Sequence, residues 1–148
     1  MKTLITGGTG FIGSCLSRLI PDATVLDFIP PELSKTEEES YHVHWYDADL
    51  CEPMEGIQEY DVIYHLAALT SVQESIKYPD LYLRVNVDGT KNLLNHLAPH
   101  QRIIFASTAA AFEPKSPYDR SKAQAEKIVL LHNKNHSAVR IYNVFGKG

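Results

Sequence analysis

The sequence has little cysteine, little excess charge and no long hydrophobic run, and each shortage excludes a class of protein. Two cysteines in 148 residues, Cys15 and Cys51, make neither a disulfide framework nor a CxxC metal pair. The net charge is −4, with no dense basic stretch, so nucleic acid is not an expected partner. No apolar run is long enough to cross a bilayer, and Met1 and Lys2 lead directly into a predicted strand, which leaves no signal peptide. These absences predict a cytoplasmic protein that does not contact membranes.

The apolar residues that are present suffice for one core, since 44% of the chain is hydrophobic and 22% is charged. Runs typical of strands alternate with longer helical patterns. The predicted strands are 2–6, 23–27, 42–46, 61–66, 102–107 and 138–142, and the predicted helices are 11–20, 79–98 and 117–136. Residues 30–40 are polar and begin with proline, which favours a surface loop. The alternation predicts a single α/β domain, a Rossmann-type doubly wound parallel sheet of about six strands.

A glycine-rich segment follows the first predicted strand and opens the first predicted helix. Residues 6–13 are Thr-Gly-Gly-Thr-Gly-Phe-Ile-Gly. In this context Gly7 permits a tight turn, Gly10 lets the backbone approach a pyrophosphate, and Gly13 allows close packing of the helix on the sheet. The segment predicts a dinucleotide site, and the alternative is an ordinary turn.

The second predicted strand ends in Asp27, at the distance at which a carboxylate accepts hydrogen bonds from an adenosine ribose. A 2′-phosphate would be repelled by this carboxylate, and no basic residue follows until Lys35. Asp27 therefore favours NAD over NADP. Acidic residues also end strands for purely structural reasons.

Tyr118 and Lys122 are four residues apart at the start of the last predicted helix, so their side chains share one face. Ser116 is the predicted N-cap and Pro117 the first helical residue. The helix dipole and the Lys122 ammonium would both favour a Tyr118 phenolate. Thr108 follows the fifth predicted strand and could hold a substrate oxygen beside Tyr118. The three residues form a proton-handling set, unless the pair is only a solvated helix face and Thr108 a turn residue.

The histidines offer weaker signals. His42 and His44 alternate on a predicted strand, and His132 and His136 are four apart on a predicted helix, a spacing that can hold a metal. No carboxylate or cysteine completes either pair locally, so no metal site is predicted. His65 ends a strand and is expected to pack there.

Several short motifs occur in an order that resembles one family. They are Thr6–Gly13, Val25–Asp27, Asp49-Leu50, His65–Ala68, Asn86–Thr90, Tyr118 with Lys122, and Arg140–Gly146. Together they resemble the extended short-chain dehydrogenases, specifically the NAD-dependent epimerase/dehydratase group, and the resemblance covers the whole chain.

The resemblance implies roles for individual residues. NAD would be contacted by Gly7, Gly10, Phe11, Ile12, Gly13, Asp27, Asp49, Leu50, Leu66, Ala67, Ala68, Thr70, Asn86, Tyr118, Lys122 and Tyr142. Tyr118 would be the base, Lys122 would bind the nicotinamide ribose and tune Tyr118, Thr108 would orient the sugar hydroxyl, and Asn143 would border the substrate. The implied reaction moves a hydride between a nucleotide sugar, with UDP-hexoses favoured, and NAD, as in sugar 4-epimerisation.

The sequence departs from this family in three places. Ala109 and Ala110 follow Thr108 where dehydratases carry Asp-Glu, so dehydration is disfavoured. The segment between Thr108 and Tyr118 is short. The chain stops at Gly148, where family members continue into a C-terminal substrate domain, so that domain is expected to be absent. A minimal enzyme, a fragment and a pocket completed by another subunit remain open, and so does a non-catalytic NAD-binding module.

The helices predicted at 79–98 and 117–136 carry apolar stripes that exceed what one sheet face would cover. The stripes comprise Leu93, Leu94 and Leu97 on the first helix and Ile128, Val129 and Leu131 on the second. In the resembling family these helices pair across a two-fold axis, which implies a homodimer.

Overall fold

The structure, a computed structural model, describes residues 1–28 and 44–146. Its six strands form one parallel sheet in the order β3-β2-β1-β4-β5-β6. The strands are β1 Thr3–Thr6, β2 Thr24–Asp27, β3 His44–Asp47, β4 Val62–His65, β5 Arg102–Thr108 and β6 Ser137–Ile141. The predicted α/β Rossmann-type sheet is confirmed. Its strand order reverses between β1 and β4, and ligands bind at such a reversal point.

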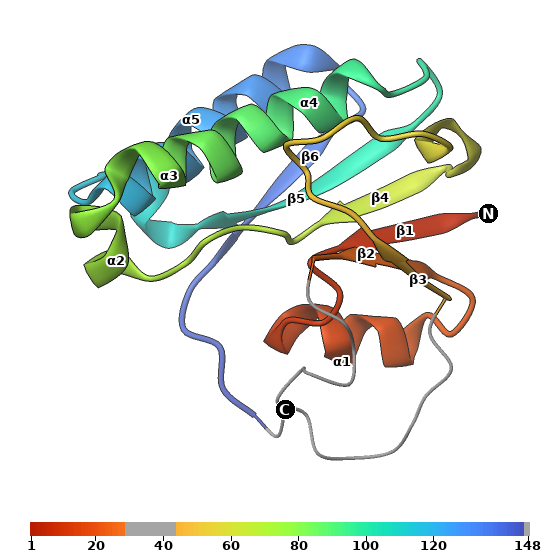
Figure 1. The fold of residues 1–148 in the computed structure, drawn as a ribbon, viewed down its shortest axis with the longest axis horizontal. Coiled ribbons are helices and arrows are strands. Elements are labelled where there is room, and N and C mark those ends of the chain that lie inside the picture. Colours follow the sequence, from red (N-terminus) through yellow and green to blue (C-terminus); the bar gives the residue numbers. More distant parts are fainter. Residues whose placement is uncertain (29–43, 147–148) are drawn as a thin grey trace.

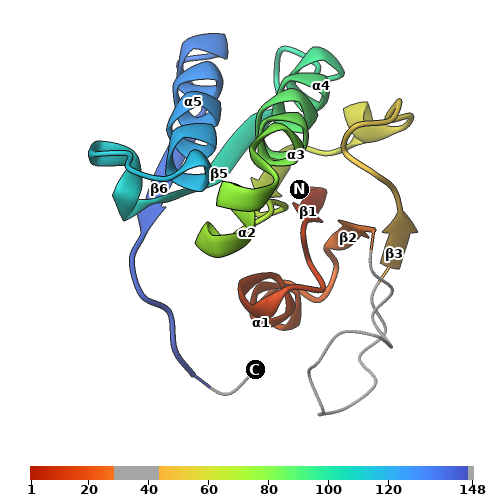
Figure 2. The ribbon, with the colours of Figure 1, turned by 60° about the vertical axis from the view of Figure 1, so that its left-hand side comes forward.

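Helices cover both faces of the sheet (Figure 1). The helix α1 (Phe11–Leu19) lies on one face, and α3 (Pro79–Leu83), α4 (Gly89–Asn95) and α5 (Pro117–His132) lie on the other. Figure 2 shows α5 beside the helix that α3 and α4 form. Successive residues of β1 point to opposite faces of the sheet and so belong to two different cores. Leu4 packs in the larger core with Ile63 and Ile103, and Ile5 packs with Val25 on the other face.

The predicted helix 79–98 is longer and more regular than the helix in the structure. A π-helical turn at Arg84–Asp88 separates α3 from α4, and α4 ends at Asn95. Pro99 disfavours the helical conformation in the residue before it, which accounts for an end ahead of Ala98. The π turn adds one residue to the helical repeat, and such turns often mark functional positions.

The predicted end of the last helix, residue 136, is also wrong. The helix α5 stops at His132 because Asn133 is extended, with φ −152 and ψ 134. The Asn133 side chain accepts from the Asn135 amide, and its carbonyl accepts from the His136 amide. Asparagine thus closes a local turn that competes with the helix. The predicted start is confirmed, because Ser116 caps the helix and Asp119 completes a capping box.

Three short elements were not predicted. They are α2 (Val72–Lys77), capped by Ser71, and single 3₁₀ turns at Ile57–Glu59 and Ala109–Phe112. Each is too short for a hydrophobic period to be recognised. The predicted third strand, 42–46, overlaps β3, although residues 42 and 43 and the predicted loop 30–40 lie outside the described residues.

The leucine stripes are mostly covered by the sheet, contrary to the prediction. Leu93, Leu94 and Val129 are fully buried, Leu97 and Ile128 pack against the same core, and Leu131 is 76% exposed. In the described part of the chain, no helix has both the length and the apolar character needed to cross a membrane.

Candidate functional site

The carboxyl ends of the strands meet at one edge, because the parallel register places Thr6 beside both Leu26 and His65. An open cavity of about 1090 Å³ lies along this edge. All sequence-predicted site residues except Asn86 line it, namely Gly7, Gly10, Phe11, Ile12, Gly13, Asp27, Asp49, Leu50, Leu66, Ala67, Ala68, Thr70, Thr108, Tyr118, Lys122, Tyr142 and Asn143. One cavity therefore brings together residues from six of the seven motifs spread over the sequence.

The glycine turn at the start of this cavity is shaped by close backbone contacts. Gly7 has φ 72, and a Cβ there would lie 2.6 Å from the Ala67 nitrogen. A Cβ on Gly13 would overlap the Gly7 carbonyl oxygen, so Gly13 packs closely against the turn itself, whereas the prediction placed its close contact on the sheet. Gly8 was not singled out from the sequence, although its Cβ would lie 2.5 Å from a methyl carbon of Val25. Only glycine, which has no Cβ, fits at these three positions.

The first turn of α1 faces the cavity without a capping side chain. Gly10 is the N-cap, no side chain accepts a hydrogen bond there, and the first turn holds no acidic residue. The amides of Phe11, Ile12 and Gly13 belong to residues that line the cavity. Such an uncapped helix start carries positive partial charge and suits an anion such as a pyrophosphate.

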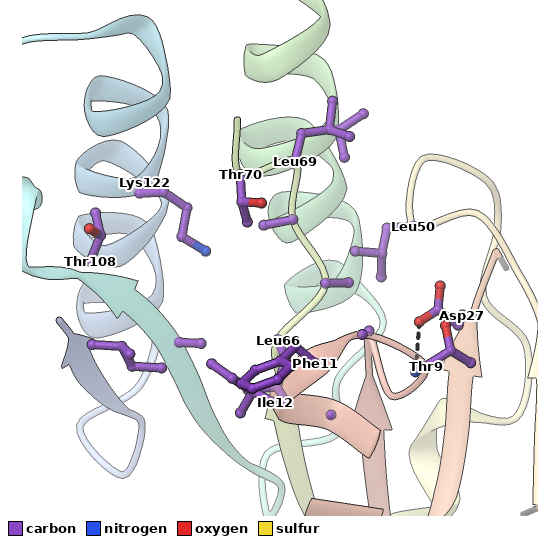
Figure 3. A pocket seen from close by; sticks show the side chains of 18 of the residues that line it. Thr9, Phe11, Ile12, Asp27, Leu50, Leu66, Leu69, Thr70, Thr108 and Lys122 are labelled. Atoms are coloured by element: carbon purple, nitrogen blue, oxygen red, sulfur yellow. Dashed lines mark hydrogen bonds between the residues drawn. The ribbon is translucent and has the colours of Figure 1, made fainter. Parts of the chain in front are cut away.

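One end of the cavity is acidic. Asp27 accepts a hydrogen bond from the Thr9 amide at 3.0 Å (Figure 3). Asp49 also lines the cavity and accepts from the Cys51 amide at 2.9 Å. The Asp27 carboxylate is therefore held by an amide of the glycine turn, and the Asp49 carboxylate by an amide of its own loop. An anionic group at this end would face two negative charges.

The opposite end of the cavity holds Thr108 and Lys122 (Figure 3). The Lys122 side chain is almost fully buried, 4% exposed, with its Nζ 4.2 Å from the centre of the Phe105 ring. Burial lowers the pKa of Lys122 from 10.5 to about 7, although the negative charge of Glu126 raises it in part. Near neutral pH, Lys122 can therefore exchange between its charged and neutral forms.

Tyr118 also lines this end of the cavity, one helical turn before Lys122. Burial raises the pKa of Tyr118 above 10.0, and a hydrogen bond with Thr108 lowers it only in part. The predicted phenolate is therefore wrong for the ligand-free chain. The sequence showed the helix start and the nearby lysine but not the loss of solvent around the ring, which is the larger effect.

Asn86 does not line the cavity. Its side chain lies behind the cavity wall and binds the backbone of Leu69, which does line the cavity. Its Oδ1 accepts from the Leu69 amide at 2.8 Å, and its Nδ2 donates to the Leu69 carbonyl at 3.0 Å and to Ser121 Oγ at 2.9 Å. Ser121 Oγ in turn donates to the Tyr118 carbonyl. Asn86, in the π-helical turn, thus connects the loop after β4 to the start of α5.

His65 extends this polar contact through the core. Thr90 Oγ1 donates to the Asn86 carbonyl, so it accepts from His65 Nε2 at 2.9 Å. His65 Nδ1 therefore accepts from Thr6 Oγ1, at 2.7 Å, and Thr6 Oγ1 is free to accept from the Ala67 amide. Burial, with a smaller effect of Lys122, lowers the pKa of His65 from 6.5 to about 3. His65 is a neutral structural residue, as its expected packing role requires.

This neutral histidine makes the stability of the chain depend on pH. The pKa of His65 lies below its unfolded value of 6.5, so the unfolded chain binds a proton that the folded chain does not. We expect the free energy of unfolding to fall between pH 6.5 and about 3, by about 1.4 kcal/mol per pH unit from this residue. Urea unfolding at pH 7, 6, 5 and 4 measures the slope. His65→Gln should be less stable at pH 7 and show a shallower slope, and parallel curves would contradict the assignment.

His132 and His136 do not form a metal site with a third ligand. Their rings stack at 5.3 Å, with His132 Nδ1 3.1 Å from His136 Nε2, and His136 Nδ1 accepts from the Ile103 amide. Within residues 1–28 and 44–146, no group of three or more metal-ligating side chains occurs.

The cavity also includes residues that were not predicted. They are Thr9, Leu26, Phe28, Ala48, Leu69, Leu81, Val85, Ala106, Ser107, Ile141 and Val144. Thr9 belongs to the glycine motif, and Ser107 precedes Thr108 at a strand end, so both carried a signal. Leu81 and Val85 come from α3 and the π-helical turn, and nothing in their local sequence distinguishes them from core residues.

Comparison with known proteins agrees with this geometry. UDP-glucose 4-epimerase of Mycoplasma genitalium is 32% identical over 181 residues, which cover 98% of this chain and 53% of that protein. The structure resembles an NAD-dependent NDP-hexosamine 5,6-dehydratase of tunicamycin biosynthesis, with a TM-score of 0.81, 29% identity, and coverage of 98% and 55%. It also resembles UDP-glucose 4-epimerase from Thermotoga maritima, with a TM-score of 0.81, 25% identity, and coverage of 99% and 57%. The chain spans about half the length of these relatives.

The family profile extends over almost the whole chain. Residues 3–148 match the NAD dependent epimerase/dehydratase family, and the matched region contains the glycine turn, Asp27 and the Tyr118–Lys122 pair. The chain therefore belongs to the NAD-dependent epimerase/dehydratase family.

Proposed function

We propose that the chain binds NAD and catalyses hydride transfer on a nucleotide sugar, with 4-epimerisation favoured over dehydration. One observation carries the proposal. A single cavity has the glycine turn and Asp27 at one end and Thr108, Tyr118 and Lys122 at the other. Residues for holding a dinucleotide and residues for handling a proton are thus arranged along one open groove.

The residues at the first end fit NAD. The turn at Gly7, Gly8 and Gly13 leaves no space for a Cβ, which brings the backbone amides of the α1 start to the cavity surface. Asp27 and Asp49 place negative charge where a ribose with free hydroxyls would be accepted and a 2′-phosphate repelled. We propose that Leu50, Leu66, Ala67, Ala68 and Thr70 pass beside the cofactor, as predicted, and that Asn86 supports them from behind.

The residues at the second end support the chemistry. NAD, when bound, supplies the acceptor and donor of the hydride. We propose that Tyr118 exchanges a proton with a sugar hydroxyl, that Thr108 orients that hydroxyl, and that Lys122 binds the nicotinamide ribose and adds positive charge beside Tyr118. The raised pKa of Tyr118 keeps its proton in place in the ligand-free chain. Tyr118 therefore needs a positive charge from its surroundings before it can act as a base near neutral pH.

Ala109 and Ala110 bear on the reaction type. A similar solved structure is a dehydratase and another is an epimerase, so similarity alone does not choose between them. Ala109 and Ala110 carry no acid or base beside Thr108, although elimination of water needs both. Sugar epimerisation or oxidation needs only the hydride and the Tyr118 proton. Several relatives at about 30% identity are UDP-glucose 4-epimerases, which supports a UDP-hexose as substrate.

A cofactor-binding module without activity is the second candidate. Tyr142 and Asn143 line the cavity but are exposed, and Tyr142 is 81% exposed. Binding energy from the distant nucleotide positions the reacting sugar, so an uncovered site favours loss of turnover or completion by a partner. The proton-handling set argues against this candidate, because a pure binding module has no need for it.

Calorimetric titration tests the proposal in two stages. NAD should bind the chain more tightly than NADP because of the charge at Asp27 and Asp49. The NAD-saturated chain should then bind UDP-glucose and UDP-galactose and interconvert them. Binding of NAD without binding of millimolar sugar nucleotide would favour the module, and preference for NADP would contradict the cofactor assignment.

We also propose a homodimer through residues 79–98 and 117–136, with fewer exposed apolar residues than the sequence predicted. The buried leucines are not available for it, but Leu83 is 41% exposed, and Leu130 and Leu131 are 44% and 76% exposed. A monomeric mass in solution scattering would remove this proposal.

A further inference from the structure

Glu126 lies one helical turn beyond Lys122 on α5 and is involved in contacts that the proposed reaction does not use. We propose that Glu126 is a positioning residue that favours the charged form of Lys122, and that Arg140 and Ser107 fix the Glu126 carboxylate in place so that the Lys122 ammonium remains in the cavity. The effect on hydride transfer rests on the proposed function. The effect on the charge of Lys122 does not.

The Glu126 carboxylate is held on both oxygens. Arg140, on β6, donates from Nη2 to Oε1 at 2.7 Å and from Nε to Oε1 and Oε2 at 3.2 and 3.1 Å. Ser107 Oγ, on β5, donates to Oε2. Glu126 itself is 7% exposed. The carboxylate is therefore anchored to two strands as well as to its own helix, and it cannot change rotamer without breaking these bonds.

This anchoring keeps two opposite charges near each other without direct contact. Residues four apart on a helix lie on one face, and the charges of Lys122 and Glu126 each affect the pKa of the other. Within the described residues, Lys122 forms no ion pair shorter than 4.0 Å with Glu126 or any other acid. A direct pair would draw Nζ along the helix and away from Thr108 and Tyr118. The anchored carboxylate instead acts through space.

A buried ammonium needs this support. Lys122 lies over the Phe105 ring, which offers a cation–π contact, but burial still lowers its pKa to about 7. The other titratable or charged groups near it are His65 on β4, Tyr118 on α5 and Arg140 beyond Glu126. His65 and Tyr118 are neutral in the ligand-free chain. Glu126 is then the negative charge that offsets the burial of Lys122.

Two substitutions on the same contact should have different effects on the titration midpoint of Lys122. Glu126→Gln keeps the shape and removes the charge, so the titration midpoint of Lys122 should fall by about one pH unit or more. Arg140→Gln leaves Glu126 charged and freer to approach Lys122, so the midpoint should rise or stay unchanged. The measurement is an NMR pH titration of the Lys122 Cε resonance in the ligand-free chain, assigned by its loss in Lys122→Met.

A purely structural role for the contact predicts a different result, because both variants disrupt the charged contact between Arg140 and Glu126. An unchanged midpoint in Glu126→Gln, or an equal fall in both variants, would overturn the proposal. The Arg140 side chain is 45% exposed, so Arg140→Gln is expected to fold even if Glu126→Gln does not. In that case Arg140→Gln alone tests the proposal, and a fall in the titration midpoint of Lys122 in this variant would contradict it. Failure to bind NAD or sugar leaves this titration unaffected, so the two proposals fail separately.

Discussion

Replacement of Tyr118 by Phe is expected to abolish turnover of the nucleotide sugar while NAD binding is nearly preserved. The ring still fills its place beside Thr108, but the hydroxyl that exchanges the proton is gone. General acid–base catalysis contributes roughly 100- to 10,000-fold, so turnover should fall by at least about 100-fold. The NAD dissociation constant should change by less than about tenfold, since one hydrogen bond at most is lost. Steady-state rates and calorimetry on the same preparations measure both quantities.

Tyr82 offers a matched control for this substitution. Its buried ring meets the Tyr118 ring edge-on, with centroids 6.5 Å apart, but it does not line the cavity. Tyr82→Phe removes a hydroxyl from the same neighbourhood and should leave turnover unchanged. Equal rates for the parent chain and Tyr118→Phe would contradict the proposed mechanism, and equal losses in both variants would point to packing instead of proton transfer.

Replacement of Gly7 by Ala is expected to give a large loss of stability. The positive φ of 72 is unfavourable for alanine, and its Cβ would lie 2.6 Å from the Ala67 nitrogen, which is backbone and cannot rotate away. The two effects together should lower the free energy of unfolding by roughly 2–5 kcal/mol. Movement of Ala67 should also displace the cavity wall, so NAD affinity should fall. Urea unfolding and NAD titration measure the two losses.

Gly56 separates the two causes. Its φ of 76 is nearly the same, but a Cβ there would meet nothing within 4 Å, and the residue does not line the cavity. Gly56→Ala should therefore cost only the backbone strain, about 1–2 kcal/mol, and leave NAD binding unchanged. If Gly7→Ala and Gly56→Ala lose the same stability, the close contact with Ala67 contributes nothing.

The part of its relatives that this chain spans includes all the segments that line the cavity. The chain spans about half their length and includes both ends of the cavity described above. The proposed binding of NAD and the ionisation of Lys122 depend on residues within this half. The proposed binding of a sugar nucleotide would depend in addition on contacts that hold the nucleotide. NAD binding and sugar-nucleotide binding can therefore be lost independently of each other, and the NAD titration and the sugar-nucleotide titration measure them separately.

The sequence by itself determined the sheet, the glycine turn, Asp27 and the Tyr118–Lys122 pair, because these depend on local patterns. Alternating strands and helices, a glycine at a tight turn and a capped helix start can all be recognised from a few neighbouring residues. The parallel arrangement then brings all strand ends to one edge, which is why nearly every predicted site residue lines the cavity.

Only the tertiary structure decided how these residues are supported and charged. Burial raises the pKa of Tyr118 and lowers that of Lys122, and burial depends on neighbours far away in the sequence. The contacts of Asn86 with Leu69 and of Glu126 with Arg140 join different elements, so no spacing rule predicts them. Desolvation and long-range hydrogen bonds arise when distant segments pack together, whereas a sequence pattern records only preferences between near neighbours.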